Sequence, residues 1–188
     1  TEYSPCRFKG FVLCPPKGKE LSQSVIQEKM EPILKRGYPI VVYQLPQITE
    51  NEMSPELIEY FTRTYSNCYM LKDSSGEDQV ALAKQDYHGM VLLRGAEGNY
   101  AEMTKLMQGP YDGFLLSTAN SFPVNLHQFT EFILTQSIPE AKQISDRLTK
   151  VVAEVFNIAK TIPVGNAFTN ANKLIDHFNA FGDSWETA

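Results

Sequence analysis

Short apolar runs alternate with helical patterns along most of this chain, and few folds accommodate such a pattern. Five such runs lie roughly 22 to 30 residues apart, the spacing of repeated strand–helix units. Two parallel strands need a crossover connection between them, usually a helix, so the pattern predicts an α/β protein with a parallel sheet. The runs are Phe11–Cys14, Pro39–Tyr43, Cys68–Leu71, Met90–Leu93 and Gly113–Leu116.

The run Phe11–Cys14 is continuously apolar and ends at two prolines, which predicts a strand buried on both faces. Ser54 followed by Pro55 is a typical helix start. Ser75 stands three residues before Asp78, which is the spacing of a capping box. The expected helices are Ser22–Lys35, the segment that starts at Pro55, Gly76–Tyr87, Tyr100–Met107, Leu126–Leu134, Pro139–Lys160 and Asn170–Phe181.

Two architectures accommodate five strand–helix units. One is an open, doubly wound sheet, which the 188 residues suit as a complete domain. The other is part of a (β/α)₈ barrel, which typically takes about 250 residues. The periodicity does not choose between them. No glycine-rich phosphate-binding motif follows any run, so nucleotide-binding versions of the open sheet have no support.

The composition is that of an ordinary globular protein. Its net charge of −5 and its lack of a lysine and arginine stripe argue against a nucleic-acid partner. No apolar run approaches the roughly 18 residues of a membrane span, and Thr1–Gly10 contains no signal-peptide core. Cys6, Cys14 and Cys68 show no CxxC spacing, and the histidines show no metal spacing. We therefore expect a cytoplasmic protein without a metal, in which Cys14 and Cys68 are buried free thiols.

Lys72 ends an apolar run, and the turn-forming cluster Asp73–Gly76 follows it. It is therefore expected at the carboxyl end of a strand, where α/β proteins bind their ligands. A lysine there can be a nucleophile if desolvation keeps part of its amine neutral. A solvated lysine at the end of a strand is the ordinary alternative.

Four strand ends carry motifs that are informative as a set, namely Tyr43–Pro46, Leu71–Gly76, Arg94–Gly98 and Gly113–Asn120. In this order and at this spacing they resemble the later strands of the N-acetylneuraminate lyase and dihydrodipicolinate synthase family. That family comprises class I, pyruvate-type aldolases on a (β/α)₈ barrel. The resemblance extends from about Phe11 to Gly182, and the ordered set is more specific than any single motif.

The resemblance implies that Lys72 forms a Schiff base with the keto group of a 2-keto acid, with no cofactor beyond this imine. It also implies that Tyr43 relays protons near the substrate carboxylate. A protonated imine draws electrons from the neighbouring carbon, so a C–C bond there can break. Further positions of the family's substrate pocket fall on Ser74, Gly95, Glu97 and Ser117.

Several of these residues also have an ordinary structural interpretation. Tyr43 can be an interior aromatic residue whose hydroxyl is satisfied. Glu97 can be a carboxylate that a helix dipole favours in the first turn. Ser117 can be a turn or cap residue.

The family barrel has eight strands, and five are expected here. The expected fold is therefore a partial (β/α)₈ TIM barrel, equivalent to strands 4 to 8, with additional C-terminal helices. Residues 1–123 would form the incomplete barrel portion, and residues 124–188 the last barrel helix and a helical extension, with the first three βα units absent. Such a wall has open edges, so we expect a homo-oligomer or a complementing N-terminal half.

The expected function is a Schiff-base-forming lyase or aldolase, or a related dehydratase. Its substrate would be a 2-keto acid such as a 2-keto-3-deoxy sugar acid, with pyruvate as product or donor. Synthases of the dihydrodipicolinate type usually carry an arginine shortly after the tyrosine motif, where this chain has Gln47–Thr49. That condensation is therefore an alternative, and a catalytically silent half-barrel that serves assembly is another.

Overall fold

The computed structural model describes residues 9–187, which belong to two compact units. Unit 1 runs to Arg94 and also contains Pro110–Gly113. Unit 2 contains Gly95–Gly109 and the chain from Phe114 onward. The boundary between the units therefore passes through the last strand of the sheet.

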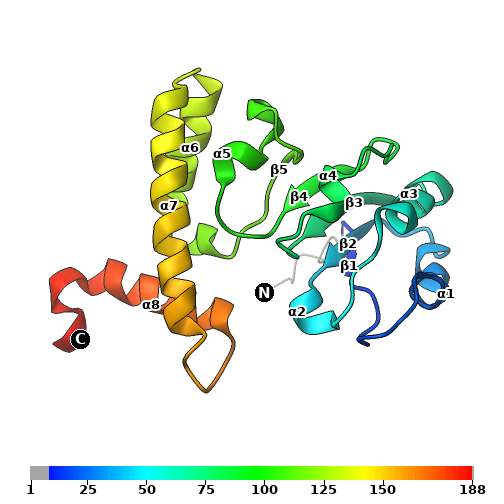
Figure 1. Ribbon diagram of the computed structural model, residues 1–188, viewed down its shortest axis with the longest axis horizontal. Coiled ribbons are helices and arrows are strands. Elements are labelled where there is room, and N and C mark those ends of the chain that lie inside the picture. The colour runs from blue at the N-terminus through cyan, green and yellow to red at the C-terminus, as the bar shows by residue number, and fades with distance from the viewer. Residues whose placement is uncertain (1–8, 188) are drawn as a thin grey trace, which may run out of the picture. The chain divides into compact units, whose positions relative to one another are not determined.

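The five predicted strands form one sheet (Figure 1). They pair in the order in which they follow one another along the chain, and the first three pairs are parallel. In a doubly wound sheet the strand order reverses at a switch point. The observed order is that of a barrel wall, and the predicted parallel α/β architecture is confirmed. The strands are β1 (Phe11–Leu13), β2 (Ile40–Gln44), β3 (Cys68–Asp73), β4 (Val91–Arg94) and β5 (Gly113–Phe114).

Serine caps fix the starts of the two longer helices of unit 1. Ser22 Oγ accepts a hydrogen bond from Val25 N, and Ser54 Oγ accepts one from Leu57 N, each at 3.3 Å. Both helices lie where the sequence predicted them. The helices of unit 1 are α1 (Gln23–Leu34), α2 (Pro46–Thr49), α3 (Pro55–Thr64) and α4 (Gln79–Leu82).

One face of the sheet is buried under α1 and α3, which lie on the same side of it in Figure 1. Alternate residues of β2 show this, because Ile40, Val42 and Gln44 are fully buried whereas Val41 and Tyr43 are half-buried. Apolar side chains of the two helices complete this core. They are Ile26, Met30, Leu34, Ile58 and Phe61, each at most 1% exposed.

The prediction that the first strand is buried on both faces is wrong. Phe11 is 50% exposed and Val12 is 64% exposed. Within residues 9–187 this strand is an edge that pairs with β2 alone, and a short apolar run does not distinguish an edge from a central strand. Cys14, which follows β1, is exposed, so its predicted burial is also wrong. Cys68 on β3 is buried as predicted.

The predicted helix Gly76–Tyr87 is wrong beyond the single turn of α4. Asp78 N donates to Ser75 Oγ at 3.3 Å, which is half of the expected capping box. The other half is missing because the Asp78 carboxylate binds Arg94 instead. Asp78 itself has a left-handed φ of 55°, which starts α4 abruptly. The fifth strand is also shorter than predicted, since only Gly113–Phe114 is extended.

Unit 2 is helical around an aromatic core. Tyr100, Phe114 and Phe129 meet edge-on, with ring centroids 5.8 to 6.5 Å apart. The helices α6 and α7 lie side by side, and α8 packs against α7 (Figure 1). The last three predicted helices are confirmed, whereas the predicted Tyr100–Met107 splits into α5 and a 3₁₀ turn. The helices are α5 (Tyr100–Met103), α6 (Pro123–Leu134), α7 (Ile138–Ala159) and α8 (Ala167–Phe181), with 3₁₀ turns at Lys105–Met107, Thr118–Asn120 and Gly182–Thr187.

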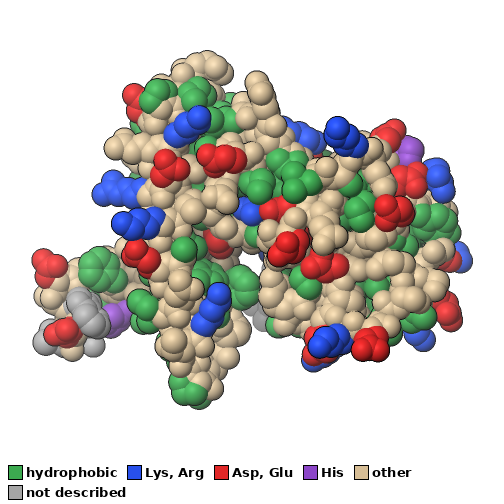
Figure 2. All heavy atoms as spheres, viewed as in Figure 1, with side chains coloured by type: hydrophobic (Ala, Val, Ile, Leu, Met, Phe, Trp, Pro, Cys, Tyr) green, Lys and Arg blue, Asp and Glu red, His purple; other side chains and the backbone are tan. Residues whose placement is uncertain are grey.

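Apolar side chains also reach the surface of unit 2 (Figure 2). Ile158 on α7 and Leu174 and Phe178 on α8 are 59%, 42% and 55% exposed. Single exposed apolar residues of this kind are usual on protein surfaces. From residue 9 to residue 187, no helix combines the length and the apolar character that a membrane crossing requires.

Candidate active site

Lys72 and Tyr43 are neighbours on adjacent parallel strands. The register pairs Tyr43 of β2 with Lys72 of β3, so their side chains leave the same face of the sheet. Lys72 Nζ lies 4.4 Å from the centroid of the Tyr43 ring, whose face attracts a cation. Each residue is the last but one of its strand. The pair therefore stands at the carboxyl end of the sheet, where the sequence predicted it.

Ser74 completes this group. Its hydroxyl donates to Tyr43 OH at 3.4 Å, and its N–H donates to Gln44 O at 2.9 Å, which ties the chain after β3 to β2. Ser74 is buried, whereas Lys72 and Tyr43 are half-buried. An amine, a phenol and a hydroxyl side by side provide a nucleophile and a path for protons.

Cys14 interacts electrostatically with Lys72. Although the residue is exposed as a whole, desolvation of its sulfur raises the pKa of the Cys14 thiol, and the positive charge of Lys72 offsets part of that rise. Burial raises the pKa of Cys68 to about 12. Both side chains are therefore thiols rather than thiolates at neutral pH.

Iodoacetamide is expected to distinguish these two cysteines in a Cys6→Ser background. Only the thiolate reacts, so the labelling rate of Cys14 should rise about tenfold per pH unit up to pH 9. Cys68 should stay unlabelled until urea unfolds the chain. Peptide mass spectrometry measures both rates, and a Cys14→Ser variant identifies the labelled site. Labelling of Cys14 that is fast at pH 7 and independent of pH would contradict the raised pKa.

Glu97 and Ser117 of unit 2 are joined by a direct hydrogen bond. Ser117 Oγ and Thr118 N donate to Glu97 Oε1 at 3.0 and 3.1 Å. Thr118 Oγ1 and Tyr100 OH donate to Glu97 Oε2 at 2.6 and 3.1 Å. These four donors occupy the acceptor positions of the carboxylate. Glu97 lies ahead of α5 rather than in its first turn, and it holds the segment that follows β5.

Gly95, the remaining predicted position, is buried at the start of unit 2. The six predicted site residues thus fall into two sets. Lys72, Tyr43 and Ser74 come together in unit 1, while Glu97 and Ser117 come together in unit 2.

A buried polar network lies on the opposite face of β3, and sequence reasoning did not find it. Arg94 binds Asp78 through two parallel hydrogen bonds of 2.9 Å, one from Nε and one from Nη2. Tyr111 OH donates to Asp78 Oδ1 at 2.7 Å and lies 3.3 Å from Asp73 Oδ2. All four side chains belong to residues that are at most 3% exposed. The available signal was Arg94, which directly follows an apolar strand, and Asp73, which follows Lys72 at the end of the preceding strand.

Burial raises the pKa of the Asp73 carboxyl. Hydrogen bonds from Ser75 oppose the rise, the Asp78 carboxylate adds to it, and Tyr111 opposes it. Burial also raises the pKa of Tyr111 far above its usual range, and the two aspartates add to this effect. Tyr111 therefore keeps its hydroxyl proton at every physiological pH.

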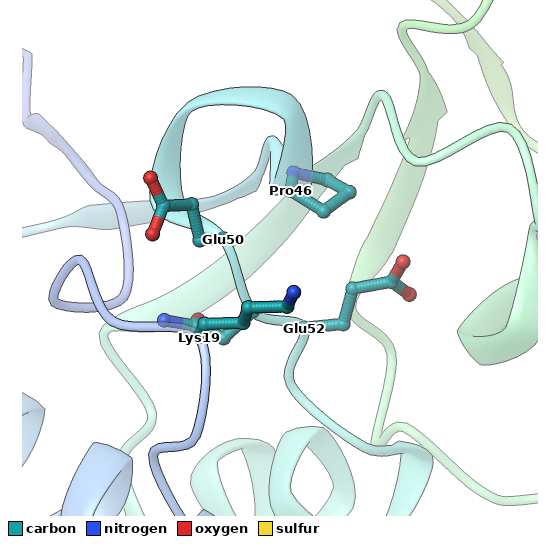
Figure 3. A pocket seen from close by; sticks show the side chains of 5 residues that line it. Lys19, Pro46, Glu50 and Glu52 are labelled. Carbon is teal, nitrogen blue, oxygen red and sulfur yellow. The ribbon is translucent and has the colours of Figure 1, made fainter.

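An open pocket of about 590 Å³ lies beside α2, and none of the predicted site residues lines it. Figure 3 shows the Lys19 amine directed toward the side of Glu52, while the Glu50 carboxylate turns away from it. Glu50 pairs with Lys17 at 3.0 Å. No group of three or more His, Cys, Asp or Glu side chains between residues 9 and 187 is arranged to hold a metal ion. The pocket is lined by Lys19, Pro46, Glu50, Asn51 and Glu52.

Five strands paired in chain order, with helices between them and polar residues at their carboxyl ends, are the arrangement found in the wall of a (β/α) barrel. The sequence profile of the Dihydrodipicolinate synthetase family matches residues 8–173. The chain belongs to this family.

Curated relatives agree with this assignment. The chain is 28% identical over 131 residues to 4-hydroxy-tetrahydrodipicolinate synthase of Campylobacter jejuni, which covers 69% of this chain and 43% of the relative. It is 24% identical over 159 residues to the protein of that name from a Thermoanaerobacter species, covering 83% and 52%. The chain thus spans about half the length of the curated relatives that it matches.

Solved structures show the same fold. The dihydrodipicolinate synthase of Bacteroides thetaiotaomicron superposes with a TM-score of 0.70 at 20% identity, over 91% of this chain and 56% of that one. The 2-keto-3-deoxygluconate aldolase of Picrophilus torridus superposes with a TM-score of 0.62 at 20% identity, over 88% and 59%.

Proposed function

We propose that this chain supplies the Schiff-base lysine of a pyruvate-type class I aldolase or a related dehydratase. The substrate would be a 2-keto acid such as a 2-keto-3-deoxy sugar acid. The observation that carries the proposal is the position of Lys72 Nζ, 4.4 Å from the Tyr43 ring at the carboxyl end of β3. Membership of the Dihydrodipicolinate synthetase family supports the same class of reaction.

The proposed reaction begins when the neutral amine of Lys72 adds to the C2 carbonyl of the keto acid and water leaves. The protonated imine that results draws electrons from C3, so the C3–C4 bond can break with its electron pair moving into an enamine. The C4 hydroxyl loses its proton and becomes the carbonyl of the released aldehyde. A proton added to C3 and hydrolysis of the imine then give pyruvate and the free amine. The intermediate is covalent and requires no further cofactor.

Tyr43 is the proposed proton relay, because its phenol stands beside the amine on the same face of the sheet. Ser74 Oγ, 3.4 Å from Tyr43 OH, extends this path. Gly95, Glu97 and Ser117 are proposed as further positions of the substrate pocket. Glu97 would act mainly by holding the Ser117 hydroxyl, since four donors already use its carboxylate.

The chain is proposed to act in the cytoplasm, within a completed barrel. The exposed apolar side chains of Phe11 and Val12 on β1 support the completed barrel, because a further strand or subunit beside β1 would cover them. A homo-oligomer or a complementing N-terminal half would cover the edge.

Two other functions have a specific observation in their favour. The name of the Campylobacter jejuni relative favours a condensation of the dihydrodipicolinate type, although Gln47–Thr49 lacks the arginine expected for it. The exposed apolar side chains of β1 favour a catalytically silent half-barrel that serves assembly.

Trapping with pyruvate and borohydride tests the proposed function. Borohydride reduces an imine to a stable secondary amine, so the chain should gain the mass of one pyruvate-derived group in an intact-mass measurement. Light scattering with and without pyruvate separates the alternatives. A defined oligomer that forms no adduct at saturating pyruvate would favour the assembly module and overturn the lyase.

A further inference from the structure

The buried network of Asp73, Asp78, Arg94 and Tyr111 has no part in the chemistry proposed above, yet it lies directly behind Lys72. We propose that Tyr111, Asp78 and Arg94 position the Lys72–Ser74 segment, and that Asp73 joins them as a protonated acid that donates to Tyr111. This inference rests on the proposed function of Lys72. The four residues act through Lys72 and do not touch the substrate, since none lies on the face of the sheet that carries Lys72, so they are positioning residues.

The Asp78–Arg94 pair ties the far end of the turn that follows β3 to the sheet. Arg94 is the last residue of β4, and Asp78 begins α4, so their two hydrogen bonds join the turn after β3 to the neighbouring strand. Both side chains are at most 4% exposed. A two-pronged contact between planar groups fixes orientation as well as distance.

Lys72 and Asp73 are consecutive residues of β3, so their side chains leave opposite faces of the strand. The register places Asp73 beside Arg94 on one side and Gln44 on the other. Holding the Asp73 carboxyl therefore fixes the rotation of the strand end, and with it the direction of the Lys72 side chain. Ser74 follows at once and reaches Tyr43.

The hydrogen atoms available to Tyr111 decide the state of Asp73. A phenol has one hydrogen, and the 2.7 Å contact with Asp78 Oδ1 takes it. The 3.3 Å contact between Tyr111 OH and Asp73 Oδ2 then joins two oxygen acceptors unless Asp73 carries a proton. A protonated Asp73 donates to the phenol oxygen, and the chain of donors runs from Asp73 to Tyr111 to Asp78.

The groups that face Asp73 favour this state. Its Oδ1 accepts a hydrogen bond from Ser75 N at 2.9 Å, and the Ser75 side chain also hydrogen-bonds the carboxyl, which a protonated acid can accept on the oxygen that carries no proton. Gln44 Nε2 makes no hydrogen bond with any described residue, so it does not stabilise a carboxylate at Asp73. Arg94 is neutralised by Asp78, and the carboxyl of Glu52 interacts with that of Asp73 unfavourably. An ionised Asp73 would leave a net negative charge in a fully buried site.

Two variants test the positioning and the proton together. Asp73→Asn keeps an oxygen that accepts from Ser75 N and gains an NH₂ group that donates to Tyr111, so it imitates the protonated acid. Tyr111→Phe keeps the ring and removes the hydroxyl that joins Asp73 to Asp78. With pyruvate and borohydride, Asp73→Asn should label Lys72 within about twofold of the wild-type rate, and Tyr111→Phe at least about tenfold more slowly. Circular dichroism controls for folding.

Urea unfolding at pH 4 and pH 7 gives a readout that needs no keto acid. The pKa of Asp73 is higher in the folded state than in the unfolded state. The protonated carboxyl therefore contributes fully to the free energy of unfolding below the unfolded-state pKa, and this contribution is lost as the pH rises through the folded-state pKa. Asp73→Asn should therefore gain stability relative to the wild type between pH 4 and pH 7.

The outcomes separate the two proposals. A Tyr111→Phe variant that labels at the wild-type rate overturns the positioning role. An Asp73→Asn variant that loses stability relative to the wild type between pH 4 and pH 7 overturns the claim that Asp73 is protonated. A wild type that forms no adduct overturns the proposed function instead, and the unfolding measurements still decide the state of Asp73.

Discussion

Replacing Asp78 by asparagine is expected to lower the free energy of unfolding by about 3 to 5 kcal/mol, the cost of breaking a buried ion pair by removing one partner. The change removes the carboxylate that binds the Arg94 guanidinium at two points, and this guanidinium is buried, because its side chain is 4% exposed. Asparagine tolerates the left-handed φ of 55° at this position, so the backbone is not the source of the loss. Urea unfolding monitored by circular dichroism measures the change.

An exposed ion pair provides the matched control for Asp78→Asn. Lys17 pairs with Glu50 at 3.0 Å, but the Lys17 side chain is 68% exposed. Lys17→Gln should therefore change the free energy of unfolding by less than about 1 kcal/mol. The double variant Asp78→Asn with Arg94→Met should lose less than the sum of the two single changes, because it removes both partners of the buried ion pair together. Equal losses for Asp78→Asn and Lys17→Gln would show that the buried pair does not hold the turn.

Replacing Lys72 by arginine is expected to reduce pyruvate trapping to the background level of the other lysines. Arginine keeps a positive charge that can lie over the Tyr43 ring, so the contact made at 4.4 Å by the lysine is imitated. A guanidinium stays protonated and offers no neutral amine to a keto group. The variant thus separates the nucleophile from the cation.

Lys29→Ala is the control for this experiment, because Lys29 is an exposed residue of α1 away from the strand ends. It should trap pyruvate at the wild-type rate. Intact-mass spectrometry after borohydride reduction compares the three proteins. Trapping by Lys72→Arg at the wild-type level would mean that another amine reacts.

Much of the fold could be predicted from the sequence, because strand and helix periodicity depends on local spacing. The strands β2, β3 and β4 and the helices α1, α3, α6, α7 and α8 all lie where apolar spacing and caps placed them. The errors occur where neighbours decide the outcome. Exposure of β1 depends on which strands lie beside it. The short α4 depends on Asp78 binding Arg94 rather than capping its own helix.

The candidate site divides in the same way. Lys72, Tyr43 and Ser74 could be placed together because parallel strands bring their carboxyl ends to one edge of the sheet. The partners of Glu97 could not be predicted, since Ser117 and Thr118 come from a turn about twenty residues later. Tyr111 could not be predicted either, because it meets Asp73 across 38 positions of sequence.

Locating the trapped group within the chain tests the central claim most directly. Wild-type protein reduced with borohydride in the presence of pyruvate is digested, and tandem mass spectrometry assigns the modified residue. The expected result is a single modified lysine, Lys72, in the peptide that spans the end of β3. Modification spread over exposed lysines, or confined to a lysine other than Lys72, would contradict the account.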